Sequence, residues 1–221
     1  MADDVIEAPL FPLNMVLFPG MAQPLHIFEP RYRRMVSDSL DSNIPFGIVL
    51  ALPESYHEHE VPARVGTFAR IIDYMRLPDG RYNLLTIGSE RFEILEVRQT
   101  RQYLVGKARI ITDEERDIPD LAQLTAQARD ALEEYLRLML TLIGSEDREI
   151  SIPHESSELS FLIAGCLTCE DSEKQELLEL RSVSERLRKE IALLHNATQE
   201  LARQLKSDLL GPRDGDRASL N

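Results

Sequence analysis

The feature that most constrains this chain is a change of hydrophobic period near residue 112. Before this point, short apolar segments alternate with turn residues, as in strands joined by tight turns. After it, apolar residues recur every three or four positions, which is the spacing of helices that pack on one face. A charged segment, 112–120, separates the two parts. The sequence therefore predicts an α+β chain, strand-rich first and helical afterwards.

The clearest strand signal is Asp79-Gly80, a turn dipeptide with strand-type residues on both sides. Such a pair predicts a β-hairpin. A second turn is expected at Gly88-Ser89. An earlier helix is expected to open at Pro30, because proline is tolerated in a first turn. Several short strands joined by tight turns are typical of a mostly antiparallel, closed or nearly closed sheet.

Four helices are expected in the second part, beginning near Asp120, Glu155, Ser172 and Ser182. The last would span roughly 27 residues and about 40 Å at 1.5 Å per residue. Its apolar face repeats at steps of four and three, which is a heptad seam with one polar member. The seam consists of Leu187, Ile191, Leu194, Thr198, Leu201 and Leu205. We expect it to pack on the chain's own helices, giving a monomer; the alternative is a weak dimer through the 182–208 helix.

These patterns predict a β-barrel subdomain over 1–115, a helical-bundle subdomain over 116–210 and a disordered tail over 211–221. The charge distribution also separates two units. Residues 1–112 contain 14 acidic and 12 basic side chains, whereas the rest of the chain contains 24 and 13. The total net charge is −13. Because neither part is basic overall, general binding to nucleic acid is disfavoured.

Several functional classes lack their sequence signature. No apolar run approaches the roughly 20 residues of a membrane span, and the acidic N-terminus is unlike a signal peptide. We therefore expect a cytoplasmic protein with no membrane association. There is no phosphate-binding loop and no G-x-S-x-G elbow. The H-E-x-x-H zinc motif fails because Val61 stands where its second histidine belongs.

The remaining metal and thiol candidates are weak. His57 and His59 alternate and would face one way on a strand, but a solvated polar loop is the favoured interpretation. Cys166 and Cys169 form a C-x-x-C, for which packing inside the bundle is favoured over a redox pair. His26, between two apolar residues, is expected to pack in the interior. No cofactor, metal site or catalytic residue is predicted, and we expect the chain not to be an enzyme.

Three blocks of the sequence resemble one family. The first is LFPLNMVLFPGMAQPLHIFEPRYRRMV, with Phe18-Pro19-Gly20 and Phe28-Glu29. The second, VGTFARIIDYMRLPDGRYNLLTIGSERFEI, contains V-G-x-x-A-x-I, the D-G hairpin and G-x-x-R-F. The third is SEKQELLELRSVSERLRKEIALL. In this order they resemble the N-terminal substrate-binding domain of the ATP-dependent protease Lon, over about residues 8–207.

The resemblance implies a PUA-like barrel followed by a helical bundle. It also implies recognition of unfolded or damaged polypeptides, or of a partner protein, in protein quality control. A full Lon protease continues into an ATPase module and a serine–lysine protease domain, and the chain ends before either begins. We therefore expect a stand-alone, non-catalytic substrate-binding protein.

Binding of this kind needs exposed apolar side chains. The candidates for a peptide-binding site are Phe18, Phe28, Tyr32, Tyr74, Met75 and Leu77. Core packing is the competing interpretation for each of them. The alternative function is an RNA-binding PUA-like module. Its support is an arginine series made up of Arg64, Arg70, Arg76, Arg81, Arg91, Arg98, Arg101 and Arg109.

Overall fold

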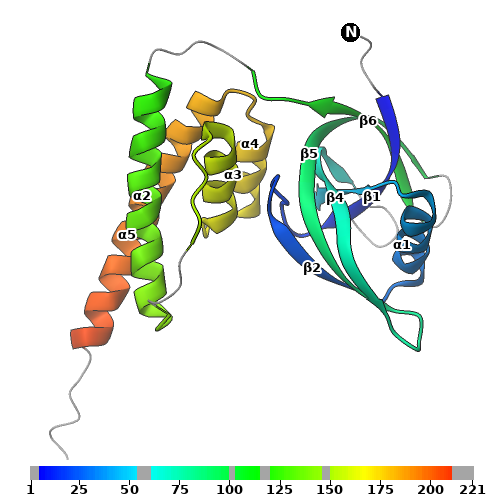
Figure 1. The fold of residues 1–221 in the computed structure, drawn as a ribbon, viewed down its shortest axis with the longest axis horizontal. Coiled ribbons are helices and arrows are strands. Elements are labelled where there is room, and N and C mark those ends of the chain that lie inside the picture. The colour runs from blue at the N-terminus through cyan, green and yellow to red at the C-terminus, as the bar shows by residue number, and fades with distance from the viewer. Residues whose placement is uncertain (1–4, 54–60, 100–102, 115–119, 146–149, 211–221) are drawn as a thin grey trace, which may run out of the picture.

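The computed structural model describes residues 5–53, 61–99, 103–114, 120–145 and 150–210. The predicted tail, 211–221, and the histidines His57 and His59 lie outside the described residues. The chain forms a strand-rich lobe and a helical lobe that stand side by side (Figure 1). The predicted order, strands first and helices afterwards, is confirmed.

Six strands form one sheet: β1 (Val5–Leu13), β2 (Ala22–Ile27), β3 (Phe46–Ala51), β4 (Pro62–Arg76), β5 (Tyr82–Gln99) and β6 (Leu104–Ile111). Their order is β2-β5-β4-β3-β1-β6, and β5 also pairs with β6. Five strands therefore close into a barrel, while β2 lies outside the ring against the first half of β5. Only β1 and β3 are parallel among the pairings of the described strands, so the barrel is mostly antiparallel, as predicted.

The hairpin predicted at Asp79-Gly80 joins β4 to β5, and Gly80 has a φ of +83°. The turn predicted at Gly88-Ser89 is wrong, because β5 continues through both residues. Glycine is required at position 88 for a different reason. A Cβ atom there would lie 2.2 Å from the backbone oxygen of Phe18. Gly88 thus permits a close approach between two segments of the chain. In a sequence, a glycine required for close approach looks the same as a glycine required for a turn.

The helix α1 (Pro30–Ser42) begins at the predicted proline. It packs against the barrel lobe through its buried face, which contributes Tyr32, Met35 and Val36 to a cluster with strand residues such as Phe46. Asn43 ends the helix in a left-handed conformation, which asparagine tolerates better than most residues. The helix therefore belongs to the strand-rich lobe.

The helical lobe contains α2 (Leu121–Leu142), α3 (Ser156–Cys166), α4 (Asp171–Glu179) and α5 (Val183–Leu210). Each begins within one residue of its predicted start. The long α5 runs beside α2 (Figure 1), and its seam residues Leu187 and Leu194 are fully buried within the chain. The seam therefore packs intramolecularly, while the oligomeric state stays a prediction. None of the described helices combines the length and the apolar character that a membrane span needs.

The two lobes share one hydrophobic cluster. Phe18 and Val65 from the strand-rich lobe pack in it with Leu132, Leu159 and Leu187 from the helices. The rings of Phe18 and Phe161 lie 6.5 Å apart. Because this contact is apolar and buried, the two lobes share one continuous core at the junction. The division into separate subdomains at residues 115 and 116 stays a prediction.

Candidate functional site

Two of the six candidate binding residues are in the interior. Phe18 is completely buried in the cluster between the lobes, and Tyr32 is buried beneath α1, 4.3 Å from the ring of Phe11. These two residues are therefore corrected from surface candidates to core residues. Both belong to well-formed apolar clusters, and a sequence alone does not separate a buried aromatic residue from an exposed one.

The other four candidates surround the β4–β5 hairpin and the end of β2. Phe28, Tyr74 and Met75 are 61%, 53% and 60% exposed, whereas Leu77 is half-buried at the turn. Their binding role stays a prediction. Tyr74 and Met75 are neighbours on one strand, so they point to opposite faces of the sheet. Tyr74 lies opposite the buried Leu84, on the inner face.

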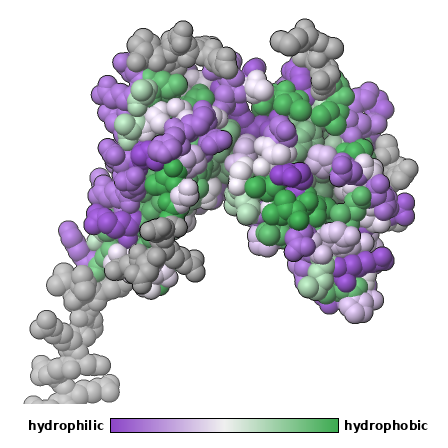
Figure 2. Space-filling view, in the orientation of Figure 1, coloured by the Kyte–Doolittle hydropathy of each residue, from purple (hydrophilic) through white to green (hydrophobic). Residues whose placement is uncertain are grey.

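Met75 belongs to the solvent face, where an apolar surface forms. It is paired through Asn83 with His26 on β2, and the ring of His26 stacks on that of Phe28 at 6.2 Å. Leu85, two residues after Asn83, lies on the same face and is also exposed. We call Phe28, Met75 and Leu85 the outer patch. Figure 2 shows hydrophobic side chains gathered on this side of the strand-rich lobe.

His26 differs from the expectation that it packs in the interior. It is exposed, and its Nδ1 lies 2.6 Å from Oδ1 of Asn83. Its Nε2 lies 3.3 Å from a guanidinium nitrogen of Arg81. The physical reason is the position of β2 outside the barrel, which gives this strand a solvent face along its whole length. The alternation of exposed and half-buried residues in β2 follows from it.

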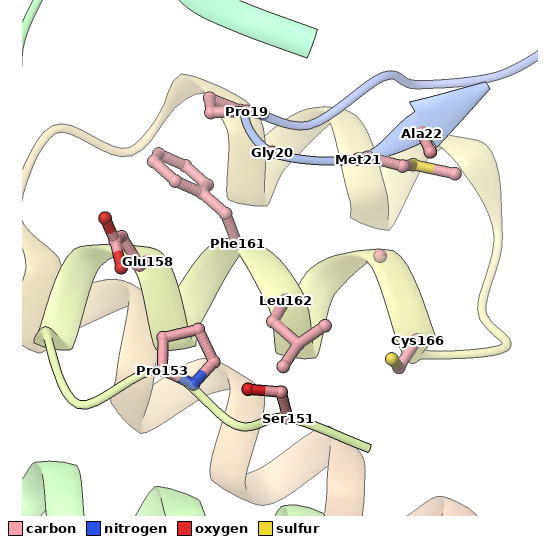
Figure 3. A pocket seen from close by; sticks show the side chains of 11 residues that line it. Pro19, Gly20, Met21, Ala22, Ser151, Pro153, Glu158, Phe161, Leu162 and Cys166 are labelled. Carbon is pink, nitrogen blue, oxygen red and sulfur yellow. The ribbon is translucent and has the colours of Figure 1, made fainter. Parts of the chain in front are cut away.

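A cavity of about 610 Å³ opens between the lobes. One wall is the segment from Pro19 to Ala22, which leads into β2, and the opposite wall is α3 (Figure 3). Its lining residues are Pro19, Gly20, Met21, Ala22, Ser151, Pro153, Glu158, Phe161, Leu162, Gly165 and Cys166. Most of these are apolar or small, as in pockets that hold apolar groups. No local sequence pattern reveals this cavity, because its walls lie about 130 residues or more apart along the chain.

A buried ionic cluster joins the lobes next to this cavity. Asp113, in the segment between the lobes, binds Arg91 of β5 at 2.5 Å and Arg186 of α5 at 2.9 Å. Arg91 also donates to the backbone oxygens of Leu178 and Leu180. Both guanidinium groups lie over the ring of Phe161. The cluster therefore connects the barrel, the linking segment and three helices.

Burial and charge act in opposite directions in this cluster. Burial would raise the pKa of Asp113, but hydrogen bonds and the charge of Arg186 outweigh it, so the pKa is lowered. Burial lowers the pKa of Arg91 to about 10, against the attraction of Asp113. Asp113 and Arg91 are therefore both charged at neutral pH. One sequence signal points to this cluster, since Arg91 is the arginine of the G-x-x-R-F block.

A second buried acid continues the cluster. Nε of Arg186 donates to the Ser160 hydroxyl, which donates to Oε1 of Glu190 at 2.8 Å. Glu190 is fully buried, and no described residue offers a hydrogen bond to its second oxygen. Burial raises the pKa of Glu190 to about 8. This carboxyl group is therefore predominantly protonated at neutral pH.

The arginine series behind the RNA alternative is largely engaged with acids. Arg64 and Arg109 pair with Glu93, Arg81 with Asp79, Arg91 with Asp113, and Arg98 with Glu96. Arg101 lies outside the described residues. Neutralised side chains release few counterions from a phosphate backbone. The RNA alternative is therefore not favoured.

The thiols and metal ligands offer no further centre in the described part of the chain. Cys166 and Cys169 are both free and half-buried, and burial raises the pKa of each thiol. A protonated thiol is a poor nucleophile. The described residues contain no group of three or more metal-ligating side chains.

Comparison with known proteins gives this arrangement a family. Residues 7–196 match the model described as the ATP-dependent protease La (LON) substrate-binding domain. The chain belongs to the Lon substrate-binding domain family. The match includes the barrel and most of the helical lobe, so the cavity and the outer patch both lie within the Lon domain.

The relatives of this Lon-type chain are full proteases and isolated domains. It is 27% identical to a Lon protease of Brevibacillus choshinensis over 90% of its own length and 26% of that protein. With a Lon protease of Anaeromyxobacter dehalogenans, the identity is 28% and the coverage 90% and 24%. The chain thus spans about a quarter of the length of these curated relatives.

Two solved structures have the same fold. A Lon N-terminal domain protein from Xanthomonas campestris has a TM-score of 0.62 and 26% identity, covering 85% of this chain and 98% of that one. The N-terminal domain of a Mycobacterium avium complex Lon protease has a TM-score of 0.66 at 19% identity, covering 86% and 99%. At this identity the second likeness concerns the fold alone.

Proposed function

We propose that this Lon-type chain binds apolar segments of unfolded or damaged polypeptides, without catalysing a reaction on them, in the quality control of cytoplasmic proteins. The substrate-binding family supports a binding role. Binding to a partner protein would use the same kind of surface. The described residues contain no group of three or more metal-ligating side chains, and burial raises the pKa of both thiols.

The observation that carries the proposal is the outer patch. Phe28 and Met75 expose more than half of their surface on one side of the sheet, and Leu85 lies between their strands. Large apolar side chains that remain together in water lower the free energy when another apolar chain covers them. Methionine also adapts to partners of different shape, which suits a binder of many sequences.

The experiment measures binding of fluorescently labelled β-casein, a natively unfolded chain, by anisotropy. The double variant Phe28→Ser, Met75→Ser should weaken binding by at least about tenfold, which corresponds to about 1.4 kcal/mol. A matched control is Leu95→Ser, Val97→Ser, which removes two exposed apolar residues from the other half of β5. The control should bind as the wild type does.

Three results would contradict the proposal: no binding of β-casein to the wild type, equal loss in the control variant, or full binding by the patch variant. The RNA alternative has its own readout. A labelled single-stranded RNA should show no salt-dependent binding, and a clear salt-dependent shift would favour that alternative.

A further inference from the structure

The strand β2 has an open edge. Among the described residues, β2 pairs with a single strand, β5, along its whole length, whereas each of the other five strands has two neighbours in the ring over at least part of its length. An exposed edge carries unpaired backbone donors and acceptors, which makes it a template for a further strand. In Figure 1, β2 is the strand of the barrel lobe that faces the helical lobe.

The backbone groups on this edge can be assigned from their neighbours. The oxygen of Met21 accepts from the amide of Gly88 at 2.9 Å, and that of Gln23 accepts from the Thr86 hydroxyl. Both therefore point toward β5. Backbone direction alternates along a strand, so Ala22, Pro24 and His26 point toward the open edge. Proline at the middle position agrees with this, because its missing amide would face outward.

The open edge ends at the cavity between the lobes. Ala22, the first residue of β2, lines the cavity, and Phe161 and Leu162 of α3 lie across from it (Figure 3). Glu158 is the one charged residue among the cavity's lining residues. The site therefore combines a strand edge, an apolar hole and a carboxylate.

We propose that an extended polypeptide segment pairs with the open edge of β2 and inserts one apolar side chain into the cavity. A basic residue beside that side chain matches Glu158 and the acidic helical lobe, which carries most of the net charge of −13. The proposal rests on the proposed function and names its mode of binding, which is addition of a strand to a sheet. Backbone pairing accepts many sequences, while the cavity and Glu158 select among them.

The length of the edge sets its selectivity. Two backbone amides, those of Ala22 and His26, point outward as donors, and the outward oxygen of Pro24 already accepts a hydrogen bond from the side-chain amide of Gln23 at 3.0 Å. An edge this short holds a strand weakly by itself. Occupation of the cavity is then required for stable binding, which restricts capture to segments with an exposed large apolar residue.

The first test fills the cavity. A Cβ atom at Gly165 would meet only the sulfur of Met21, at 3.9 Å, so a larger side chain can enter the cavity without moving the backbone. Gly165→Leu should weaken β-casein binding at least tenfold while leaving the circular dichroism spectrum and melting temperature intact. Gly165→Ala, which adds one carbon, should have a smaller effect. Undiminished binding by a folded Gly165→Leu protein would overturn the cavity's role.

The second test changes the edge in opposite directions. Ala22→Pro removes an outward donor and should weaken binding, whereas Pro24→Ala adds one and should strengthen it. In the complex with β-casein, the amides of Ala22 and His26 should exchange with deuterium more slowly than in the free protein. Unchanged exchange at both amides, or the same direction of change in both variants, would overturn strand addition.

The third test concerns charge. Two peptides of about ten residues, identical except for Lys or Glu beside a central Leu, should differ in affinity in favour of Lys, and Glu158→Gln should reduce that difference. Equal affinities would contradict the role of Glu158. If wild-type protein binds β-casein but these variants and amides do not respond, strand addition fails and the proposed function stands. If wild-type protein does not bind at all, both fail.

Discussion

Two buried arginines at the lobe junction depend on one carboxylate for their ion pairs. Among the described residues, Asp113 is the one acid that pairs with both Arg91 and Arg186, and these two arginines are almost completely buried. A buried guanidinium is stable only while its charge and hydrogen bonds are matched. Loss of the Asp113 carboxylate should therefore lower the free energy of unfolding more than loss of a carboxylate from an exposed ion pair.

Asp113→Asn removes this charge and leaves two buried cations without their acid. We expect the free energy of unfolding to fall by about 3–5 kcal/mol, measured by urea denaturation at pH 7. Asp120→Asn is the matched control, because Asp120 is exposed and its side chain makes no capping hydrogen bond. A fall of less than about 1 kcal/mol in Asp113→Asn would show that the cluster does not stabilise the junction.

Because the pKa of Glu190 is raised, its contribution to the free energy of unfolding should change with pH in the direction opposite to that of an acid whose pKa is lowered. Its pKa is raised from 4.5 to about 8, so the folded state binds a proton that the unfolded state has already lost in this range. Stability therefore falls as pH rises from about 5 to 8, by up to about 1.4 kcal/mol per unit. Asp113, with its lowered pKa, is ionised in both states over this window.

The test compares Glu190→Gln with the wild type by urea denaturation at several pH values. The variant should gain stability relative to the wild type as pH rises from 5 to 8. Glu185→Gln, at an exposed position of the same helix, should follow the wild type. A constant difference between Glu190→Gln and the wild type would mean that Glu190 is ionised in the folded state.

At the scale of elements, the sequence predicted what local patterns control. The hairpin at Asp79-Gly80, the first turn at Pro30 and the starts of the four later helices follow from turn chemistry and helical period. The mistaken turn at Gly88 has a long-range cause, because Phe18 approaches it from 70 residues earlier. Of the six candidate binding residues, three are more than half exposed and Leu77 is half-buried. The burial of the other two, Phe18 and Tyr32, depends on tertiary packing that no local pattern contains.

Gly88→Ala tests the physical reason for that mistake. The added carbon would lie 2.2 Å from the Phe18 oxygen, so the strand and the preceding segment would have to separate. We expect a loss of about 1–3 kcal/mol in unfolding free energy, the usual range for overpacking. Gly165→Ala, whose new carbon would meet only the Met21 sulfur at an ordinary van der Waals distance of 3.9 Å, should be neutral or slightly stabilising. Equal effects at the two positions would refute the close-approach explanation.

For the whole molecule, the shared cluster and the ionic junction predict one cooperative unfolding transition. Most tyrosines lie in the strand-rich lobe, with Tyr135 in the helices, whereas ellipticity at 222 nm reports mainly the helices. Urea transitions followed by tyrosine fluorescence and by ellipticity should therefore coincide. Transitions with distinct midpoints would show instead that the lobes unfold independently.

The junction between the lobes also affects the expected rate at which the protein binds an unfolded chain. The buried contacts of Phe18 and of the arginine cluster connect the two lobes, so we expect the cavity beside β2 to be open before a segment binds. In that case no slow rearrangement precedes docking, and the rate of encounter limits how fast the protein binds unfolded chains. Such a cavity would discriminate between segments by their dissociation rates, because their association rates would be similar.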